Sequence, residues 1–178
     1  MVDKAAKIGW IGTGIMGKNM AGYLQKAGYG HLSVFNRTAS KADDLVRNGA
    51  TFMPAIEVAK QADYLFLMLG YPHDVESMVI GDVGVLSHMK RGAFLIDHTS
   101  SSPELAVRIH EKAKVAGVES VDAPVTGGDI GARNGTLVVM TGGDKEAAAH
   151  VTPLLENYAQ DVRYMGVAGA GHHTKMAN

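Results

Sequence analysis

Residues 7–17 read KIGWIGTGIMG and carry a G-x-G-x-x-G pattern formed by Gly12, Gly14 and Gly17. A short apolar run leads into the pattern, and a segment with apolar residues on one helical face follows it. In dinucleotide-binding folds, a strand, a tight glycine turn and a helix in this order hold the pyrophosphate at the helix N-terminus. The pattern therefore predicts a dinucleotide site with contacts from the whole turn, namely Gly12, Thr13, Gly14, Ile15, Met16 and Gly17.

Each glycine has a separate reason in this interpretation. Gly12 permits the sharp exit from the strand, Gly14 lets a pyrophosphate approach the backbone without meeting a Cβ atom, and Gly17 lets the helix pack closely on the strand. A glycine turn that binds no ligand is the competing interpretation, because the chain contains 22 glycines. The flanking strand and helix patterns favour the dinucleotide site.

The same stretch also resembles the phosphate loop of nucleoside triphosphatases. Gly12 to Lys18 reads G-x-x-x-x-G-K, but the next residue is Asn19, where that loop needs serine or threonine to bind magnesium. The apolar run Tyr64–Leu69 also does not end in an aspartate that could hold the metal. A triphosphatase therefore stays as the disfavoured alternative.

The end of the second expected strand, His31–Asn36, bears on the choice of cofactor. NAD-preferring sites place an acidic residue here to bind the ribose hydroxyls, whereas this chain continues Asn36-Arg37-Thr38. The Arg37 guanidinium can pair with a 2′-phosphate, and Asn36 and Thr38 can donate hydrogen bonds to it. We predict NADP as the cofactor, with NAD as the other possibility and Arg37 as an ordinary surface cation in that case.

Strand and helix patterns alternate along nearly the whole chain. This alternation predicts a Rossmann-type, doubly wound α/β fold with a mostly parallel sheet and helices on both faces. The further expected strands are 50–53, 63–69, 93–97, 119–122, 135–142 and 161–165, and the expected helical segments are 40–48, 54–61, 74–79, 83–89, 103–116, 144–158 and 172–178.

Ligands of open α/β sheets bind at the carboxyl ends of the strands. Two expected strands end there in polar or glycine-containing loops, at Leu69-Gly70 and at the hydroxyl-rich Thr99-Ser100. We predict that these four residues also contact the cofactor. Helix capping is the simpler role for the second loop, since Ser102 precedes Pro103 at the start of a helical pattern.

Composition limits the remaining possibilities. A chain of 178 residues with 46% hydrophobic residues suits a folded domain, and a net charge of −1 argues against a nucleic-acid partner. No cysteine is present, so disulfides are excluded, and no membrane span or secretory signal is visible. We expect a cytoplasmic protein without a membrane or nucleic-acid partner.

Three motifs in order resemble the β-hydroxyacid dehydrogenase family. They are the glycine turn, the sequence DAPVTGG at 122–128, and the pattern G-x-G-x-x-x-K from Gly169 to Lys175. The family includes 3-hydroxyisobutyrate dehydrogenases, tartronate semialdehyde and glyoxylate/succinic semialdehyde reductases, and 6-phosphogluconate dehydrogenases. The resemblance covers essentially the whole chain as the family's N-terminal domain.

The resemblance implies roles for individual residues. Lys175 corresponds to the family's general acid/base, and a lysine can serve if burial and the nicotinamide charge lower its pKa. Thr126, Gly127 and Gly128 correspond to the turn that binds the substrate carboxylate, with threonine where serine is commoner. Asn178 stands next to the position of the family's amide partner for the lysine. No metal is expected, because no third ligand accompanies the adjacent His172 and His173.

The implied function is hydride transfer between NADP(H) and a small β-hydroxyacid or its semialdehyde. We expect residues 1–168 to be the NADP-binding domain and 169–178 to begin an interdomain helix leading to a helical domain that the sequence does not contain. Such a fragment should bind cofactor but be nearly inactive alone, and the full-length protein should be a homodimer or homotetramer. A 6-phosphogluconate dehydrogenase-type activity and a non-catalytic dinucleotide-binding module are the alternatives.

Overall fold

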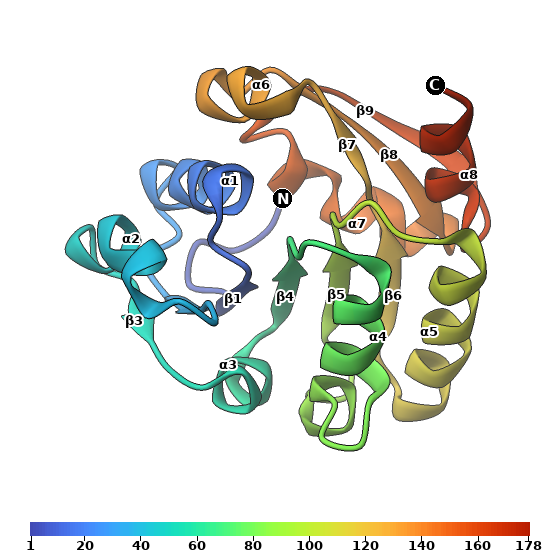
Figure 1. Ribbon diagram of the computed structural model, residues 1–178, viewed down its shortest axis with the longest axis horizontal. Helices are drawn as coiled ribbons and strands as arrows, with labels where there is room; N and C mark the ends of the chain where they lie inside the picture. The colour runs from blue at the N-terminus through green and yellow to red at the C-terminus, as the bar shows by residue number, and fades with distance from the viewer.

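The chain folds around β1 (Ile8–Ile11), which lies between β2 (Leu32–Phe35) and β4 (Tyr64–Leu67) in the middle of a parallel array. The computed structural model describes residues 1–178 (Figure 1). The sheet has nine strands in the order β3-β2-β1-β4-β5-β6-β8-β7, with β9 paired to β8. The remaining strands are β3 (Thr51–Phe52), β5 (Phe94–Asp97), β6 (Glu119–Asp122), β7 (Val125–Thr126), β8 (Leu137–Gly143) and β9 (Ala159–Gly166).

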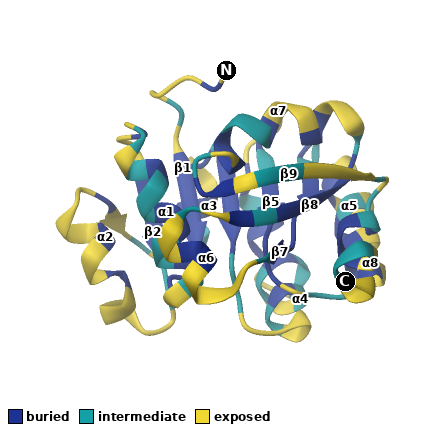
Figure 2. Cartoon of the chain, turned by 90° about the horizontal axis from the view of Figure 1, so that it is seen from above, coloured by how far each residue is buried: buried dark blue, intermediate teal, exposed yellow.

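Helices cover both faces of this sheet, as the doubly wound prediction required (Figures 1 and 2). Figure 2 shows mostly buried central strands, with exposed residues along β9 and on the outer sides of the helices. No helix is long and apolar enough to cross a membrane. The helices are α1 (Ile15–Lys26), α2 (Asp43–Arg47), α3 (Ala55–Gln61), α4 (Pro72–Ile80), α5 (Pro103–Ala116), α6 (Gly128–Asn134), α7 (Lys145–Leu155) and α8 (Ala170–Ala177), with 3₁₀ turns at Ala39–Ala42 and Val85–His88.

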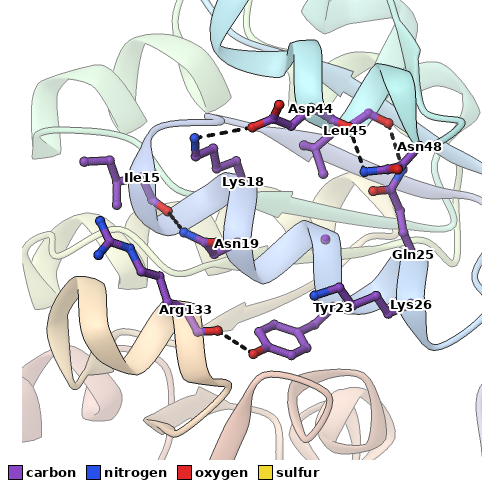
Figure 3. A pocket seen from close by; sticks show the side chains of 11 residues that line it. Ile15, Lys18, Asn19, Tyr23, Gln25, Lys26, Asp44, Leu45, Asn48 and Arg133 are labelled. Carbon is purple, nitrogen blue, oxygen red and sulfur yellow. Dashed lines mark hydrogen bonds and ion pairs between the residues drawn. The ribbon is translucent and has the colours of Figure 1, made fainter.

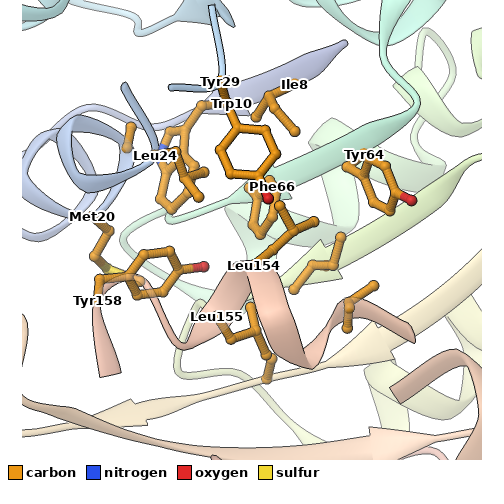
Figure 4. Packing of buried hydrophobic residues seen from close by; sticks show 14 of the residues in the cluster. Ile8, Trp10, Met20, Leu24, Tyr29, Tyr64, Phe66, Leu154, Leu155 and Tyr158 are labelled. Carbon is orange, nitrogen blue, oxygen red and sulfur yellow. The ribbon is translucent and has the colours of Figure 1, made fainter. Parts of the chain in front are cut away.

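The strand side chains alternate between two hydrophobic clusters. In β1, Trp10 faces the cluster shared with α1 and α7, whereas Ile11 faces the cluster shared with α3, α4 and α5. Figure 4 shows the first cluster, in which the rings of Trp10 and Phe66 stack with their centroids 5.0 Å apart. Full burial of such a side chain contributes about 1.5–3 kcal/mol, so packing rather than helix propensity stabilises these short elements.

Two parts of the topology differ from the sequence-based expectation. The strand β7 and the helix α6 were not predicted, and the strand β8 runs antiparallel to β6 and β7. The expected helices 40–48 and 83–89 are instead a 3₁₀ turn followed by the short α2, and a 3₁₀ turn alone. Their apolar residues satisfy a helical period, but each segment is too short to fix an α-helix by itself.

A buried polar network links the chain just after β5 and β6 to the residue before β9. His98 is fully buried, with Nδ1 2.6 Å from the Ala123 carbonyl oxygen and Nε2 2.7 Å from the Tyr158 hydroxyl. In a neutral ring Nδ1–H donates to Ala123, and Nε2 accepts from the hydroxyl of Tyr158. Burial lowers the pKa of His98 to about 4.

This pKa predicts an acid-sensitive contribution to stability from His98. The unfolded chain binds the proton at a pKa near 6.5, so the contribution is present above that pH and is lost as pH falls towards 4. Replacing His98 with glutamine removes the titration, and the stability advantage of the parent over His98→Gln should shrink by about 2 kcal/mol between pH 7.5 and 5. Urea unfolding at both pH values measures it.

The comparison with a variant is needed because Asp97 changes the stability with pH in the opposite direction. Burial raises the pKa of Asp97 to about 6, so its contribution to stability increases as pH falls through 6 towards the unfolded value of 3.8. The parent alone can therefore show a nearly flat profile. The matched control is His31→Gln, which removes an exposed histidine instead. A difference between the parent and His98→Gln that does not change with pH would contradict the assignment.

Candidate functional site

The glycine turn between β1 and α1 has the geometry that its sequence predicts. Gly12 has φ +101°, and a Cβ atom there would lie 2.1 Å from the Met68 carbonyl oxygen. At Gly17 a Cβ atom would lie 1.9 Å from the Gly12 carbonyl oxygen, so the helix could not pack as it does. Gly14 is different, because nothing lies within 4 Å of the position of its Cβ atom. The packing of the protein thus requires glycine at positions 12 and 17, whereas Gly14 leaves open space beside the turn.

The N-terminus of α1 offers hydrogen-bond donors beside this space. Gly14 is the N-cap residue and no side chain caps the helix, so the N–H groups of Ile15, Met16 and Gly17 have no partner within the helix. The Thr13 hydroxyl oxygen is also buried without a hydrogen-bond partner. Unpaired N–H groups, an orphaned hydroxyl and the positive end of a twelve-residue helix suit an anionic group, and the turn fits a dinucleotide pyrophosphate.

The end of β2 is tied directly to this turn. The Thr13 N–H donates to Asn36 Oδ1 over 2.8 Å, and Asn36 Nδ2 donates to the Thr38 carbonyl oxygen over 3.0 Å. Asn36 therefore holds the turn and the following loop together and keeps one amide N–H for a ligand. Arg37 and Thr38 are exposed at the end of β2, the strand end that binds the ribose of the cofactor in dinucleotide-binding folds.

The loops after β4 and β5 also support one another at the carboxyl edge. The Leu69 N–H donates to the Thr99 hydroxyl over 2.8 Å, and the Thr99 N–H donates to Asp97 Oδ1 over 3.0 Å. Thr99 is fully buried, so its hydroxyl fixes the Leu69 loop, while Gly70 and Ser100 are the exposed members of this pair of loops. The sequence predicted all four residues as cofactor contacts and did not distinguish residues that hold the loops in place from residues that can touch the cofactor.

The turn Thr126-Gly127-Gly128 joins the edge strand β7 to α6. Gly127 has φ +128° and Gly128 has φ +61°, backbone conformations that favour glycine, and both are exposed. Thr126 is half-buried at the end of β7. The turn therefore presents backbone N–H groups at the start of a helix, as an anion-binding turn does.

The helix α6 is docked on α1 by a hydrogen bond outside the turn. The Tyr23 hydroxyl donates to the Arg133 carbonyl oxygen over 2.5 Å, and a Cβ atom at Gly135 would lie 3.0 Å from the Tyr23 ring. Figure 3 shows this contact at the rim of a groove of about 720 Å³ between α1, α2 and α6. The groove lies along the outer side of α1, and Ile15 is its only lining residue from the predicted cofactor turn. We therefore do not assign the cofactor to it.

The third motif forms the helix α8. Lys175 is half-buried on this helix, His173 and Asn178 are exposed, and His172 is buried at 1% exposure. The helix begins at the carboxyl end of β6, because the Gly169 N–H donates to Asp122 Oδ1 over 2.9 Å. The structure thus brings the start of the lysine helix to the same edge as the glycine turn and the Leu69 and Thr99 loops. No hydrogen bond joins Lys175 to the Thr126–Gly128 turn.

Sequence reasoning assigned no role to Asp122 and considered His172 only as a metal ligand. No group of three or more histidine, aspartate or glutamate side chains is arranged to hold a metal ion. Asp122 heads the DAPVTGG motif, and that position was the one signal that could have identified it. Its partners Gly169 and His172 lie 47 and 50 residues away, so local patterns do not reveal the contacts.

Comparisons with known proteins agree with this geometry. Residues 7–166 match the family model described as the NAD binding domain of 6-phosphogluconate dehydrogenase. A probable mitochondrial 3-hydroxyisobutyrate dehydrogenase-like protein of Arabidopsis thaliana is 44% identical over 174 residues, which is 97% of this chain and 52% of the relative.

Two solved structures share the fold over nearly the whole chain. The 3-hydroxyisobutyrate dehydrogenase of Mycobacterium tuberculosis with L-serine has a TM-score of 0.90 at 30% identity and covers 97% of this chain and 58% of its own. Psf3 in complex with NADP⁺ and 2-OPP has a TM-score of 0.90 at 31% identity and covers 96% of this chain and 61% of its own. The chain thus spans between half and two-thirds of the length of these proteins.

Proposed function

Because this chain belongs to the β-hydroxyacid dehydrogenase family as an N-terminal NAD-binding domain, we propose that it is the cofactor-binding part of an oxidoreductase acting on small β-hydroxyacids or their semialdehydes. In this proposal residues 1–168 form the NADP-binding domain, and 169–178 begin the helix that leads to a substrate-closing helical domain. The observation that carries it is the open space at Gly14 beside the unpaired N–H groups of α1.

The chain's own residues divide the work in this proposal. The N–H groups at the start of α1 bind the pyrophosphate, and the turn from Thr126 to Gly128 binds the substrate carboxylate through backbone N–H groups. Lys175 accepts the hydroxyl proton when the alcohol is oxidised and returns it when the carbonyl is reduced. When bound, the nicotinamide supplies the hydride acceptor or donor.

The single tryptophan offers a direct test of cofactor binding. Trp10 Nε1 donates to the Gly12 carbonyl oxygen over 2.9 Å, so its emission reports on the glycine turn. Titration with NADPH, NADH and ATP should quench Trp10 emission with the two dinucleotides and leave ATP as the weakest ligand. Preferential binding of ATP would reject the dinucleotide proposal in favour of a triphosphatase.

Cofactor choice is the finer part of the proposal, and Arg37 determines it. The guanidinium is exposed at the end of β2 and can form a charge-assisted pair with a 2′-phosphate, which NADH lacks. The solved relative in complex with NADP⁺ supports this preference. Replacing Arg37 with alanine should weaken NADPH binding about 10- to 50-fold and change NADH binding less than about 2-fold, as measured by the same titration.

The matched control for Arg37 is Arg47→Ala. Arg47 is also an exposed arginine, but it lies on α2 and pairs with Asp44. This variant should leave the affinities for both cofactors unchanged. Equal losses of NADPH affinity in the two variants would mean that overall positive charge, and not the position of Arg37, determines binding.

A further inference from the structure

A cluster of three buried titratable side chains lies under the lysine helix, and the proposed mechanism does not use it. Asp97 and Asp122 end the neighbouring strands β5 and β6 and are register partners, so their side chains lie on the same face of the sheet. Both are buried, with 8% and 5% exposure, and His172 of α8 is buried at 1%. Buried charges of this kind are retained only with specific partners.

Asp122 provides the cap that α8 otherwise lacks. The N-cap residue Gly169 has no side chain, and its N–H donates to Asp122 Oδ1 over 2.9 Å. The His172 N–H donates to the other carboxylate oxygen, Oδ2, over 3.2 Å. One carboxylate thus satisfies two N–H groups at the positive end of the helix, where a negative charge is most favourable.

The backbone around Asp122 is shaped to admit this carboxylate. A Cβ atom at Gly142 would lie 2.7 Å and 2.8 Å from the two carboxylate oxygens. A Cβ atom at Gly171 would lie 2.8 Å from Oδ2 and 2.5 Å from the Met140 carbonyl oxygen. Side chains at either position would separate α8 from β6 and β8, against which it packs (Figure 1). The two glycines therefore set how closely the helix approaches the sheet.

The imidazole of His172 lies beside this contact. Its Nδ1 is 3.4 Å from Asp122 Oδ2, and neither ring nitrogen has an aligned hydrogen bond. Burial alone would raise the pKa of Asp122, but the interactions with His172 and Gly169 outweigh burial and lower it. Asp97 accepts one main-chain hydrogen bond, from the Thr99 N–H, and burial raises its pKa to about 6. Asp122 is thus the more acidic of the two carboxylates under the helix.

We propose that Asp122, paired with His172, is a positioning residue that fixes α8 on the sheet and so holds Lys175 at the carboxyl edge of the site. Lys175 lies three residues after His172, one turn further along the same helix, so movement of the helix start moves the lysine. The role of Lys175 rests on the proposed function. The anchoring of α8 does not, and the two are tested separately.

The anchoring is tested by hydrogen exchange in the 178-residue chain carrying Asp122→Asn. Asparagine offers one acceptor oxygen for two N–H donors and no charge, so the amides of α8 should exchange about 10-fold faster or more, with those of α1 unchanged. Unchanged exchange in α8 would overturn the proposal. The control is Asp144→Asn, which removes the carboxylate that lies 3.5 Å from His110 Nε2 and should leave α8 unchanged.

A second variant keeps the proposal testable if Asp122→Asn does not fold. His172→Gln retains the main-chain N–H that donates to Asp122 and removes only the imidazole. The amides of α8 should then exchange about 3-fold faster, a smaller effect than that of Asp122→Asn. Exchange at the parent rate in His172→Gln would show that the imidazole does not contribute to the anchor.

Kinetics distinguishes positioning from a merely structural role. In the enzyme that carries this chain, Asp122→Asn should lower kcat about 10-fold or more, leave the KM for NADPH within about 2-fold, and keep both limbs of the kcat–pH profile. A loosened α8 with unchanged kcat would reject positioning. If Lys175→Ala is fully active, the proposed function fails, whereas the exchange result still decides whether Asp122 anchors the helix.

Discussion

Replacing Gly14 with alanine is expected to weaken NADPH binding about 100-fold or more and to change the free energy of unfolding by no more than about 1 kcal/mol. Gly14 has φ −64°, which alanine adopts readily, and no protein atom lies within 4 Å of the added methyl group. The methyl group would instead occupy the space into which the pyrophosphate must approach. Trp10 quenching and urea unfolding measure the two quantities.

Gly12→Ala and Gly30→Ala are the two control variants, the first for loss of stability and the second for a harmless added methyl group. At Gly12 a methyl group meets the Met68 carbonyl oxygen at 2.1 Å, and φ is +101°, so this variant should lose stability by about 2 kcal/mol or more. Gly30 is another glycine with open space, remote from the turn, and its variant should behave like the parent in both assays. If Gly14→Ala binds NADPH as tightly as the parent does, the pyrophosphate does not bind at this turn.

Replacing Lys175 with alanine in the enzyme that carries this chain is expected to lower kcat about 1,000-fold and to leave the KM for NADPH nearly unchanged. General acid–base groups typically contribute 10²- to 10⁴-fold, and the lysine is the one such group proposed for the reacting hydroxyl. Steady-state kinetics with a β-hydroxyacid measures the effect. Parent-like activity would reject the catalytic role and favour a dinucleotide-binding module without chemistry.

Two further variants separate proton transfer from charge and from helix stability. Lys175→Arg keeps the positive charge but cannot release a proton near neutral pH, so it should be nearly as inactive as Lys175→Ala. His173→Ala changes an exposed neighbour on the same helix and should retain full activity. An active Lys175→Arg variant would mean that the residue binds the substrate electrostatically.

Local patterns were sufficient where the physical requirement is local. The helix α5 was predicted with its observed bounds, Pro103–Ala116, because Ser102 caps it through the Leu105 N–H and Gly117 ends it at φ 73°. The glycine turn was predicted from its own spacing and from the strand and helix patterns that flank it, and the clash that Gly17 avoids is with Gly12 of the same turn. The family resemblance added the candidate roles of Lys175 and Thr126–Gly128, which remain predictions.

The helix α6 shows why other elements were missed. It has seven residues, begins with glycine and contains a second glycine, so its intrinsic helix propensity is low. It forms because Gly131 lets Leu137 pack closely and because Tyr23 binds the Arg133 carbonyl oxygen from 110 residues away. Tertiary contacts therefore stabilise a helix that the local sequence disfavours.

The sequence by itself determined the doubly wound fold, the glycine turn and the family, because hydrophobic periodicity and turn chemistry act between near neighbours in the chain. Only the tertiary structure decided which polar side chains form hydrogen bonds inside the protein and which stay exposed. Thr99 supports Leu69, His98 binds Tyr158, and Asp122 anchors the helix of Lys175. Each pairing satisfies a buried polar group that would be costly alone, and its partner lies 30 to 60 residues away in the chain.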